Sequence, residues 1–444
     1  MSKYEKGLFI FYRDLRIIDN TTLIELNKLC KSILTIFIFT PEQVTNQNKY
    51  KSNNSIQFMI ESLTDLENTI QSKNGKLHVF FGNNISIIKN ILENYKIDVI
   101  GYNKDITPFA TQRDKQVNEL CDKMSIPVIS LNDYYLQELS TILNNQNQVY
   151  KKFTPYYNNA IKHKIRLPSN TPSFYFSKEN KTLKHKITLP EALHKFTVNN
   201  NEILLHGGRQ NAIPQFKIAL KSQKNYAKTH NNLDKNTSLL SAYIKFGCLS
   251  IREIYQGFKN NKAFVRQLFW RDFYANILFA YPYVLGKAMK PNYSKIKWKS
   301  NKRWFTAWCN GDTGFPIVDA AMRELNVTGY QPNRGRLITS SFLVKTLLID
   351  WQLGEKYFAQ QLVDYDPASN NGNWQWTAGT GADSQPYFRI FNPWLQQKEY
   401  DPECLYIKKW IPELADLDNK IIHNWYKEYN THMKEVKYPK PICD

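Results

Sequence analysis

Residues 364–393 hold the densest group of side chains that could do chemistry, because acidic, amide, glycine and tryptophan residues lie close together there. Trp374 and Trp376 are separated by one residue, and the amide pair Asn370 and Asn371 lies just before them. An ordinary hydrophobic core does not need this mixture of polar and indole groups. Tryptophan is redox-active, and its ring can stack on a planar ligand. We therefore expect this segment to be a functional site with an aromatic platform around a planar molecule.

A second cluster consists of the hydroxyl residues Thr237, Ser238 and Ser241, which precede a run of helical spacing. The unpaired N–H groups and the dipole of a helix N-terminus attract anions, so hydroxyls placed there can help to hold a phosphate. The same residue types are also the usual N-terminal caps of helices. Both interpretations stay open from these residues alone.

Two further helical segments carry polar side chains. In residues 266–274, the i, i+3, i+4, i+7 spacing puts four polar or aromatic residues on one face, a pattern that an ordinary buried amphipathic helix rarely uses. The helix that begins near residue 333 has a basic first turn, and composition alone favours a solvated helix start there. The residues concerned are Gln267, Trp270, Arg271 and Tyr274 in the first segment, and Asn333, Arg334 and Arg336 in the second.

Charged residues also follow the first predicted strand, at residues 13–20. Open α/β sheets bind ligands at the carboxyl ends of their strands, so this position suits a site. A turn held by ion pairs that caps the next helix is the simpler interpretation, and from these residues alone we favour it. The residues are Arg13, Asp14, Arg16, Asp19 and Asn20, with Asp19 or Asn20 as the expected cap.

The length of 444 residues predicts two domains. The chain has 59 Lys and Arg against 39 Asp and Glu, a net charge of +20, which favours a polyanionic partner such as nucleic acid. Its many Lys, Asn and Ile residues offer another explanation, since AT-rich coding also raises the positive charge. The six scattered cysteines lack the spacing of a metal site and predict reduced thiols. Without a signal peptide or a long apolar run, we expect a soluble intracellular protein, cytoplasmic or nuclear.

Short apolar runs alternate with segments of helical spacing over residues 1–136. This alternation predicts a parallel, doubly wound sheet with helices on both faces. A GxGxxG turn is missing from the region, which argues against a conventional dinucleotide site in it. The predicted strands are residues 8–12, 33–39, 77–81, 98–102 and 127–131, and the predicted helices are residues 56–70, 85–92 and 117–124.

Residues 137–200 are polar and irregular, with stretches rich in Asn, Pro and Ser, and they predict an interdomain linker. After about residue 201 the strand pattern largely disappears. Long segments of helical spacing then predict an all-α domain over residues 201–444. Its clearest predicted helices are residues 264–278, 317–325 and 337–349.

Taken together, these motifs resemble the DNA photolyase and cryptochrome family over most of the chain. The matching stretches are the turn after the first strand, TSLLSAYIKFGCLS, RQLFWRDFY, NRGR and DYDPASNNGNWQW. The resemblance implies that the helical domain binds FAD in a U-shape and that the α/β domain holds an antenna pigment, either a folate or a deazaflavin. The implied flavin-binding residues are Tyr226, Thr237, Ser238, Leu239, Leu240, Ser241, Gln267, Arg271, Arg336, Asp364, Tyr365, Asp366 and Asn370.

The resemblance also implies roles in electron transfer and in DNA binding. Asn370 would face the reactive N5 of the flavin, Arg336 would pair with Asp364, and three tryptophans would carry electrons between flavin and surface. The implied electron-transfer residues are Trp298, Trp351 and Trp374. The implied DNA-binding residues are Gln267, Trp270, Arg271, Tyr274, Asn333, Arg334, Trp376, Arg389 and Gln396.

Several positions depart from the family's pattern. Gln267 replaces the Glu of many cyclobutane-dimer photolyases, and a Gln can hydrogen-bond a thymine but cannot supply charge or a proton. Asn333 and Leu337 stand where (6-4) photolyases place two histidines, so the acid proposed for that lesion is missing. Phe109 and Ala110 stand where folate-binding members have an Asn-Glu pair, which leaves the antenna pigment unidentified.

The resemblance therefore implies a lyase that repairs cyclobutane pyrimidine dimers in damaged DNA with light, and we expect it to be a monomer. The lesion leaves the base stack, excited reduced flavin donates an electron, and the electron returns after the ring splits. One alternative is a cryptochrome, of DASH or another type. It would act as a blue-light sensor or as a photolyase for single-stranded DNA. Sensors of this kind commonly have a long C-terminal extension, and we expect none here because the sequence ends at YPKPICD. A nucleic-acid-binding protein that has lost its cofactor is the other alternative.

Overall fold

The computed structural model describes residues 2–235, 237–384, 389–432 and 434–443. Residues 385–388, part of the segment predicted as a functional site, lie outside this description. The chain divides into two compact units. The first comprises Met1–Asn200, Leu205–Lys221 and Leu239–Pro282, and the second comprises Asn201–Leu204, Ser222–Ser238 and Tyr283–Asp444. The predicted division at residues 136 and 200 stays a prediction.

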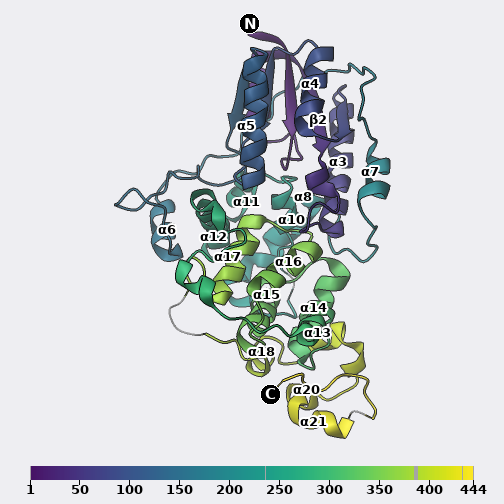
Figure 1. The fold of residues 1–444 in the computed structure, drawn as a ribbon, viewed down its shortest axis with the longest axis vertical. Helices are drawn as coiled ribbons and strands as arrows, with labels where there is room; N and C mark the ends of the chain where they lie inside the picture. Colours follow the sequence, from purple (N-terminus) through teal and green to yellow (C-terminus); the bar gives the residue numbers. More distant parts are fainter. Residues whose placement is uncertain (1, 236, 385–388, 433, 444) are drawn as a thin grey trace. The chain divides into compact units, whose positions relative to one another are not determined.

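The first unit is built on a five-stranded parallel sheet in the order β3-β2-β1-β4-β5. Strand β2 of this sheet is labelled in Figure 1. All five predicted strands are present, with shifts of a few residues at their ends. The order reverses direction between β1 and β4, which is the switch point of an open α/β sheet. The strands are β1 (Tyr4–Phe11), β2 (Cys30–Phe39), β3 (Leu77–Phe81), β4 (Val99–Asn103) and β5 (Val128–Leu131).

Helices cover both faces of this sheet, as the doubly wound pattern predicts. Leu8 and Ile10 of β1 belong to a hydrophobic core with residues of α4 and α5. The alternate residue Phe9 faces the other way, near Gly101, whose missing Cβ would lie 3.1 Å from Leu26 of α1. The helices between the strands are α1 (Thr21–Leu29), α2 (Pro41–Val44), α3 (Asn53–Ser72), α4 (Asn84–Asn94) and α5 (Pro108–Lys123).

Side-chain caps fix where these helices begin. Asn20 caps α1 by accepting a hydrogen bond from the backbone N–H of Leu23. The expected cap at this turn is therefore Asn20, while Asp19 takes a left-handed conformation with φ of 48°. Ser52 and Thr107 cap α3 and α5 in the same way.

The prediction that residues 137–200 are irregular is wrong for two stretches. Helix α6 (Phe153–Ala160) and helix α7 (Leu189–Phe196) form there. Thr188 and Glu191 make a capping box at the start of α7, which a purely compositional interpretation overlooks. Other residues of the segment bond to the sheet, since Phe81 N–H donates to the carbonyl of His185 and Ile187 N–H donates to that of Val79.

The remaining elements are helical, as expected. The predicted helix at 337–349 ends early, because α15 stops at Ser341 and a π-helical turn, Phe342–Thr346, follows it. None of the described helices is long and apolar enough to cross a membrane. In chain order, these helices are α8 (Arg209–Ser222), α9 (Tyr226–Thr229), α10 (Ser241–Lys245), α11 (Ile251–Phe258), α12 (Lys262–Ala280), α13 (Lys302–Asn310), α14 (Pro316–Thr328), α15 (Asn333–Ser341), α16 (Trp351–Gln361), α17 (Pro367–Ala378), α18 (Pro393–Tyr400), α19 (Leu405–Trp410), α20 (Asn419–His423) and α21 (Trp425–His432).

Candidate functional site

Helix α17 carries the tryptophans that the sequence singles out, and it places them on different sides. The Asp366 side chain caps the helix by accepting from Ser369 N–H at 2.9 Å. Two residues along an α-helix turn the side chain by about 200°. Trp374 is accordingly buried, whereas Trp376 is only half-buried. The expectation that both indoles form one platform is therefore wrong, since the helix separates their directions.

Trp374 lies in the hydrophobic core of the second unit. Its ring centroid is 5.0 Å from that of Phe358 and 6.2 Å from that of Trp308. Trp351 is buried in the same core, and Trp298 is half-buried and packs against it. The three tryptophans predicted to carry electrons therefore share one core, and one of them lies near its edge. Trp308 was not singled out from the sequence.

The predicted ion pair between Arg336 and Asp364 is present in the second unit. Nη2 of Arg336 is 3.1 and 2.9 Å from the two carboxylate oxygens of Asp364. Burial lowers the pKa of Arg336, but the charge and hydrogen bond of Asp364, together with Tyr330 and Glu324, raise that pKa above its usual value. Nearby, the hydroxyl groups of Thr237 and Tyr330 are 2.9 Å apart. Tyr365, which follows Asp364, is half-buried against the core.

Asn370 and Asn371 are both held by Glu355 of helix α16. The amide nitrogen of Asn370 donates to the backbone carbonyl of Glu355 at 3.0 Å. Asn371 donates to the Glu355 carboxylate and to the carbonyl of Val284, both at 3.0 Å. These bonds fix the direction of the Asn370 amide, and its oxygen accepts no hydrogen bond from any described residue.

Glu355 gives the pH dependence of this region. Burial raises the pKa of Glu355 to about 7, although the hydrogen bond from Asn371 partly offsets this. A carboxyl with a raised folded-state pKa adds stability below its unfolded pKa and loses it as the pH rises through 7. Glu355→Gln should therefore raise the free energy of unfolding at pH 8 by about 1–3 kcal/mol, and with it the melting temperature. At pH 5 the substitution should change the melting temperature little. Thermal melts at the two pH values measure the difference.

The exposed Glu119 of α5 offers a matched control for that experiment. Glu119→Gln should shift the melting temperature equally and slightly at both pH values, because its charge is solvated. A Glu355→Gln variant with the same melting temperature as the wild type at pH 8 would contradict the assignment of a buried carboxyl with a raised pKa.

Several predicted DNA-binding residues lie together in the second unit. Arg334 donates to the side-chain oxygens of Asn231 at 2.8 Å and Gln396 at 3.3 Å, and its guanidinium lies 4.1 Å from the ring centroid of Tyr400. The buried Arg334 is therefore held in place by protein groups. Asn333, the first residue of α15, and Arg389 are exposed.

The hydroxyl cluster before α10 does not act as its cap. Leu240 is the N-cap residue of α10, and it makes no side-chain capping bond. Ser241 is exposed, and Leu239 adopts a left-handed conformation with φ of 55°, which is uncommon for a branched residue. Tyr226, upstream, stacks on His230 with ring centroids 5.0 Å apart.

Helix α12 presents its predicted residues at graded depths in the first unit. Gln267 is exposed, Trp270 and Arg271 are half-buried, and Tyr274 is buried. Arg271 donates to the carbonyl of Tyr134 and lies over the ring of Tyr135, 4.7 Å from its centroid. Spacing along the helix could not predict these depths.

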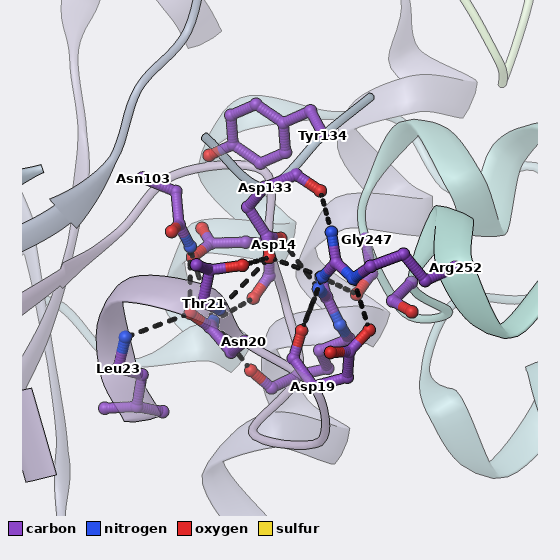
Figure 2. A network of polar contacts seen from close by, with 12 residues as sticks. Asp14, Asp19, Asn20, Thr21, Leu23, Asn103, Asp133, Tyr134, Gly247 and Arg252 are labelled. Atoms are coloured by element: carbon purple, nitrogen blue, oxygen red, sulfur yellow. Dashed lines mark hydrogen bonds and ion pairs between the residues drawn. The ribbon is translucent and has the colours of Figure 1, made fainter. Parts of the chain in front are cut away.

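The charged turn after β1 forms a buried network with α11, shown in Figure 2. Arg252 of α11 bonds to both Asp19 and Asp133 at 2.7 Å, and Arg16 bonds to Asp133 at 2.7 Å. Burial alone would raise the pKa of Asp133, but the charges of Arg16 and Arg252 lower it below its usual value. Asp14 accepts hydrogen bonds from Asn20 and Asn103 in the same network. The ion-paired turn favoured from these residues alone is therefore confirmed.

Known proteins similar to this chain show its family. Residues 8–173 match the family described as "DNA photolyase", and residues 264–444 match the "FAD binding domain of DNA photolyase". A deoxyribodipyrimidine photo-lyase of Alkalihalophilus pseudofirmus is 34% identical over 98% of this chain and 94% of that protein. The Escherichia coli enzyme of the same name is 30% identical over 98% and 94%. This chain belongs to the DNA photolyase family.

Solved structures agree with this assignment. An archaeal photolyase from Sulfolobus tokodaii, described with two FAD molecules, has 37% identity and a TM-score of 0.89, with 99% of this chain and 96% of that chain covered. A Synechocystis cryptochrome has 28% identity and a TM-score of 0.90, covering 100% and 97%. The photolyase fold and the FAD-binding domain predicted from the sequence are confirmed. Because a cryptochrome matches as well as a photolyase, the fold does not separate these two functions.

Proposed function

We propose that this photolyase repairs cyclobutane pyrimidine dimers in DNA by light-driven electron transfer. The observation that carries the proposal is the fixed amide of Asn370, which lies, like the Arg336–Asp364 ion pair, within the residues that match an FAD-binding domain. Reduced FAD, when bound, supplies the electron that light drives into the dimer and that returns after the ring opens. The protein's own residues must bind, orient and shield these partners.

The residues proposed to hold FAD fit its chemistry. The start of α10 is proposed to receive the diphosphate, with the hydroxyl residues Thr237, Ser238 and Ser241 close to it in the sequence. Asp364, oriented by Arg336, and Asp366 supply carboxylates for the polar edges of the cofactor. The remaining positions proposed to hold it are Tyr226, Leu239, Leu240, Gln267, Arg271 and Tyr365.

Asn370 is the residue proposed to face the flavin N5. Its amide nitrogen is bonded to Glu355, so its oxygen is the group that can accept a hydrogen bond from a reduced flavin ring. Burial raises the pKa of Glu355 to about 7, so this carboxyl is about half protonated at neutral pH, which lessens the negative charge beside a reduced cofactor. Both features favour a site that stabilises the reduced form.

The lesion site is proposed to use the half-buried indoles of Trp270 and Trp376 as stacking surfaces. An exposed Gln267 can hydrogen-bond the carbonyl and imide groups of thymine without adding charge. The chain lacks histidines at Asn333 and Leu337, which favours a cyclobutane dimer over a (6-4) lesion. The other proposed DNA contacts are Arg271, Tyr274, Asn333, Arg334, Arg389 and Gln396, and the net charge of +20 supports phosphate binding.

An oligonucleotide with a single thymine cyclobutane dimer tests this function. Chemically reduced, FAD-loaded protein should restore the intact thymines under blue light and not in the dark. A matched oligonucleotide with a (6-4) lesion should stay unrepaired. Failure to restore thymines in light, with FAD present, would favour the second candidate, a cryptochrome that acts as a sensor, for which the Synechocystis neighbour is the specific reason.

A Trp374→Phe variant separates repair from flavin reduction. Because Trp374 lies in the tryptophan-rich core and would be the first residue to pass an electron to the flavin, its loss should strongly slow photoreduction. The same variant, reduced chemically, should repair dimers at the wild-type rate. Trp410→Phe is the control, since Trp410 packs against the same core. Equal photoreduction of wild type and Trp374→Phe would remove Trp374 from the electron path.

An antenna pigment in the α/β part of the chain belongs to the same proposal. Folate and deazaflavin are the candidates from the family resemblance, and the two FAD molecules of the Sulfolobus tokodaii photolyase add a flavin to them. The absorption spectrum of the natively purified protein distinguishes folate from deazaflavin by their bands, and the amount of FAD per protein chain reveals a second FAD.

A further inference from the structure

Helix α6 places an aromatic ring directly on Trp270. The rings of Phe153 and Trp270 have centroids 3.6 Å apart and planes only 6° apart, so they overlap face to face. Phe153 is buried, whereas Trp270 is half-buried. Phe153 therefore covers one face of the Trp270 indole. The part of the indole that solvent reaches lies on its other face or its edges.

Neighbouring groups hold this stack in place. Phe273 meets both rings edge-on, at 5.7 Å from Phe153 and 5.6 Å from Trp270. The Arg266 guanidinium lies 4.8 Å from the Phe153 centroid and 4.9 Å from that of Tyr157. Isolated aromatic pairs prefer offset or edge-to-face contacts over a full overlap. The surrounding packing thus selects an arrangement that fixes the plane of the Trp270 indole.

We propose that Phe153 is a positioning residue for the lesion, because it sets the plane of Trp270 so that the opposite face of the indole receives the flipped bases. The proposal rests on the proposed function of Trp270. Stacking of a base on an aromatic ring depends on the two planes being parallel, so a tilted indole loses contact with the lesion. Loss of Phe153 should accordingly weaken dimer binding and leave the later electron transfer unchanged.

Phe153→Leu removes the ring and keeps an apolar side chain. The dissociation constant for a dimer-containing oligonucleotide, measured in the dark by fluorescence anisotropy, should rise roughly 2- to 12-fold. Repair per absorbed photon at saturating oligonucleotide should equal that of the wild type. Phe153→Tyr, which keeps the ring, should recover most of the affinity.

Phe258→Leu is the matched control for a general loss of packing. Phe258 stacks on Phe264 with centroids 3.7 Å and planes 15° apart, and Phe264 lies on the same helix α12 as Trp270. This variant should melt at a lower temperature and still bind the dimer as the wild type does.

Two results would overturn the inference alone: wild-type affinity in Phe153→Leu, or an equal loss of affinity in Phe258→Leu. If the wild-type protein itself neither prefers the dimer nor repairs it, the proposed function fails, and the role of Phe153 fails with it. Measuring wild-type repair first therefore tells the two failures apart.

Discussion

Replacing Arg252 with methionine should lower the free energy of unfolding of the first unit by about 3–5 kcal/mol. Arg252 is buried and bonds to the carboxylates of Asp19 and Asp133 and to the backbone carbonyls of both residues. Methionine fills similar space, but it leaves Asp19 as a buried carboxylate without its ion-pair partner. Asp133 keeps Arg16, so the cost arises mainly at Asp19.

Thermal and denaturant unfolding measure this loss. Lys28→Met is the matched control, because Lys28 forms an exposed pair with Glu25 on α1, and such pairs contribute about 0–1 kcal/mol. The double variant Asp19→Asn with Arg252→Met should recover part of the stability, since it removes the stranded charge and Asn tolerates the left-handed backbone at that position. A single Arg252→Met variant as stable as Lys28→Met would show that the network contributes little.

The sheet could be predicted from the sequence because each strand is a local apolar run between turn residues. Residues 77–81 match β3 at both ends. Helices were predicted well where one face is apolar, as in α3, and poorly where it is not. Helix α5 begins at Pro108, nine residues before the predicted start, because few residues of its first half are buried and the apolar spacing begins only at Val117.

Contacts between distant segments could not be predicted from periodicity. The partners of Arg252 lie 233 and 119 residues away, and nothing near α11 in the sequence points to them. Phe153 lies in a stretch that composition marks as a linker, yet it stacks on a residue of α12. Glu355 was missed because a single Glu in an amphipathic helix gives no signal until its burial is known.

The family resemblance supplied most of what the local patterns could not. It predicted the Arg336–Asp364 pair, which joins the first turn of α15 to the segment before α17. It could not supply the direction of side chains on α17, where helical geometry alone separates Trp374 from Trp376. Local sequence patterns therefore predicted the helices and strands, and the family resemblance predicted the site. The burial of each side chain is known only from the structure.

Gly354→Ala should disturb the tryptophan core more than any other small substitution on helix α16. A Cβ at Gly354 would lie 2.2 Å from the Trp374 ring and 2.6 Å from the Leu343 side chain. Both neighbours are fully packed, so the ring must move by about 1 Å, and overpacking of this kind costs roughly 1–3 kcal/mol. The better helix propensity of alanine offsets about 1 kcal/mol of this cost.

The melting temperature of Gly354→Ala should therefore fall by a few degrees, and photoreduction of the flavin should slow because the displaced ring is the one proposed to deliver the electron. Gly335→Ala on α15 is the control, since its nearest neighbour is a Gln331 side-chain carbon at 3.0 Å, which can shift. Chemically reduced Gly354→Ala should still repair dimers, because chemical reduction of the flavin does not need electron transfer through Trp374. If Gly354→Ala melts and photoreduces as the wild type does, the core around Trp374 has room for a methyl group. That result would contradict the close packing of the Trp374 ring against Gly354 of α16.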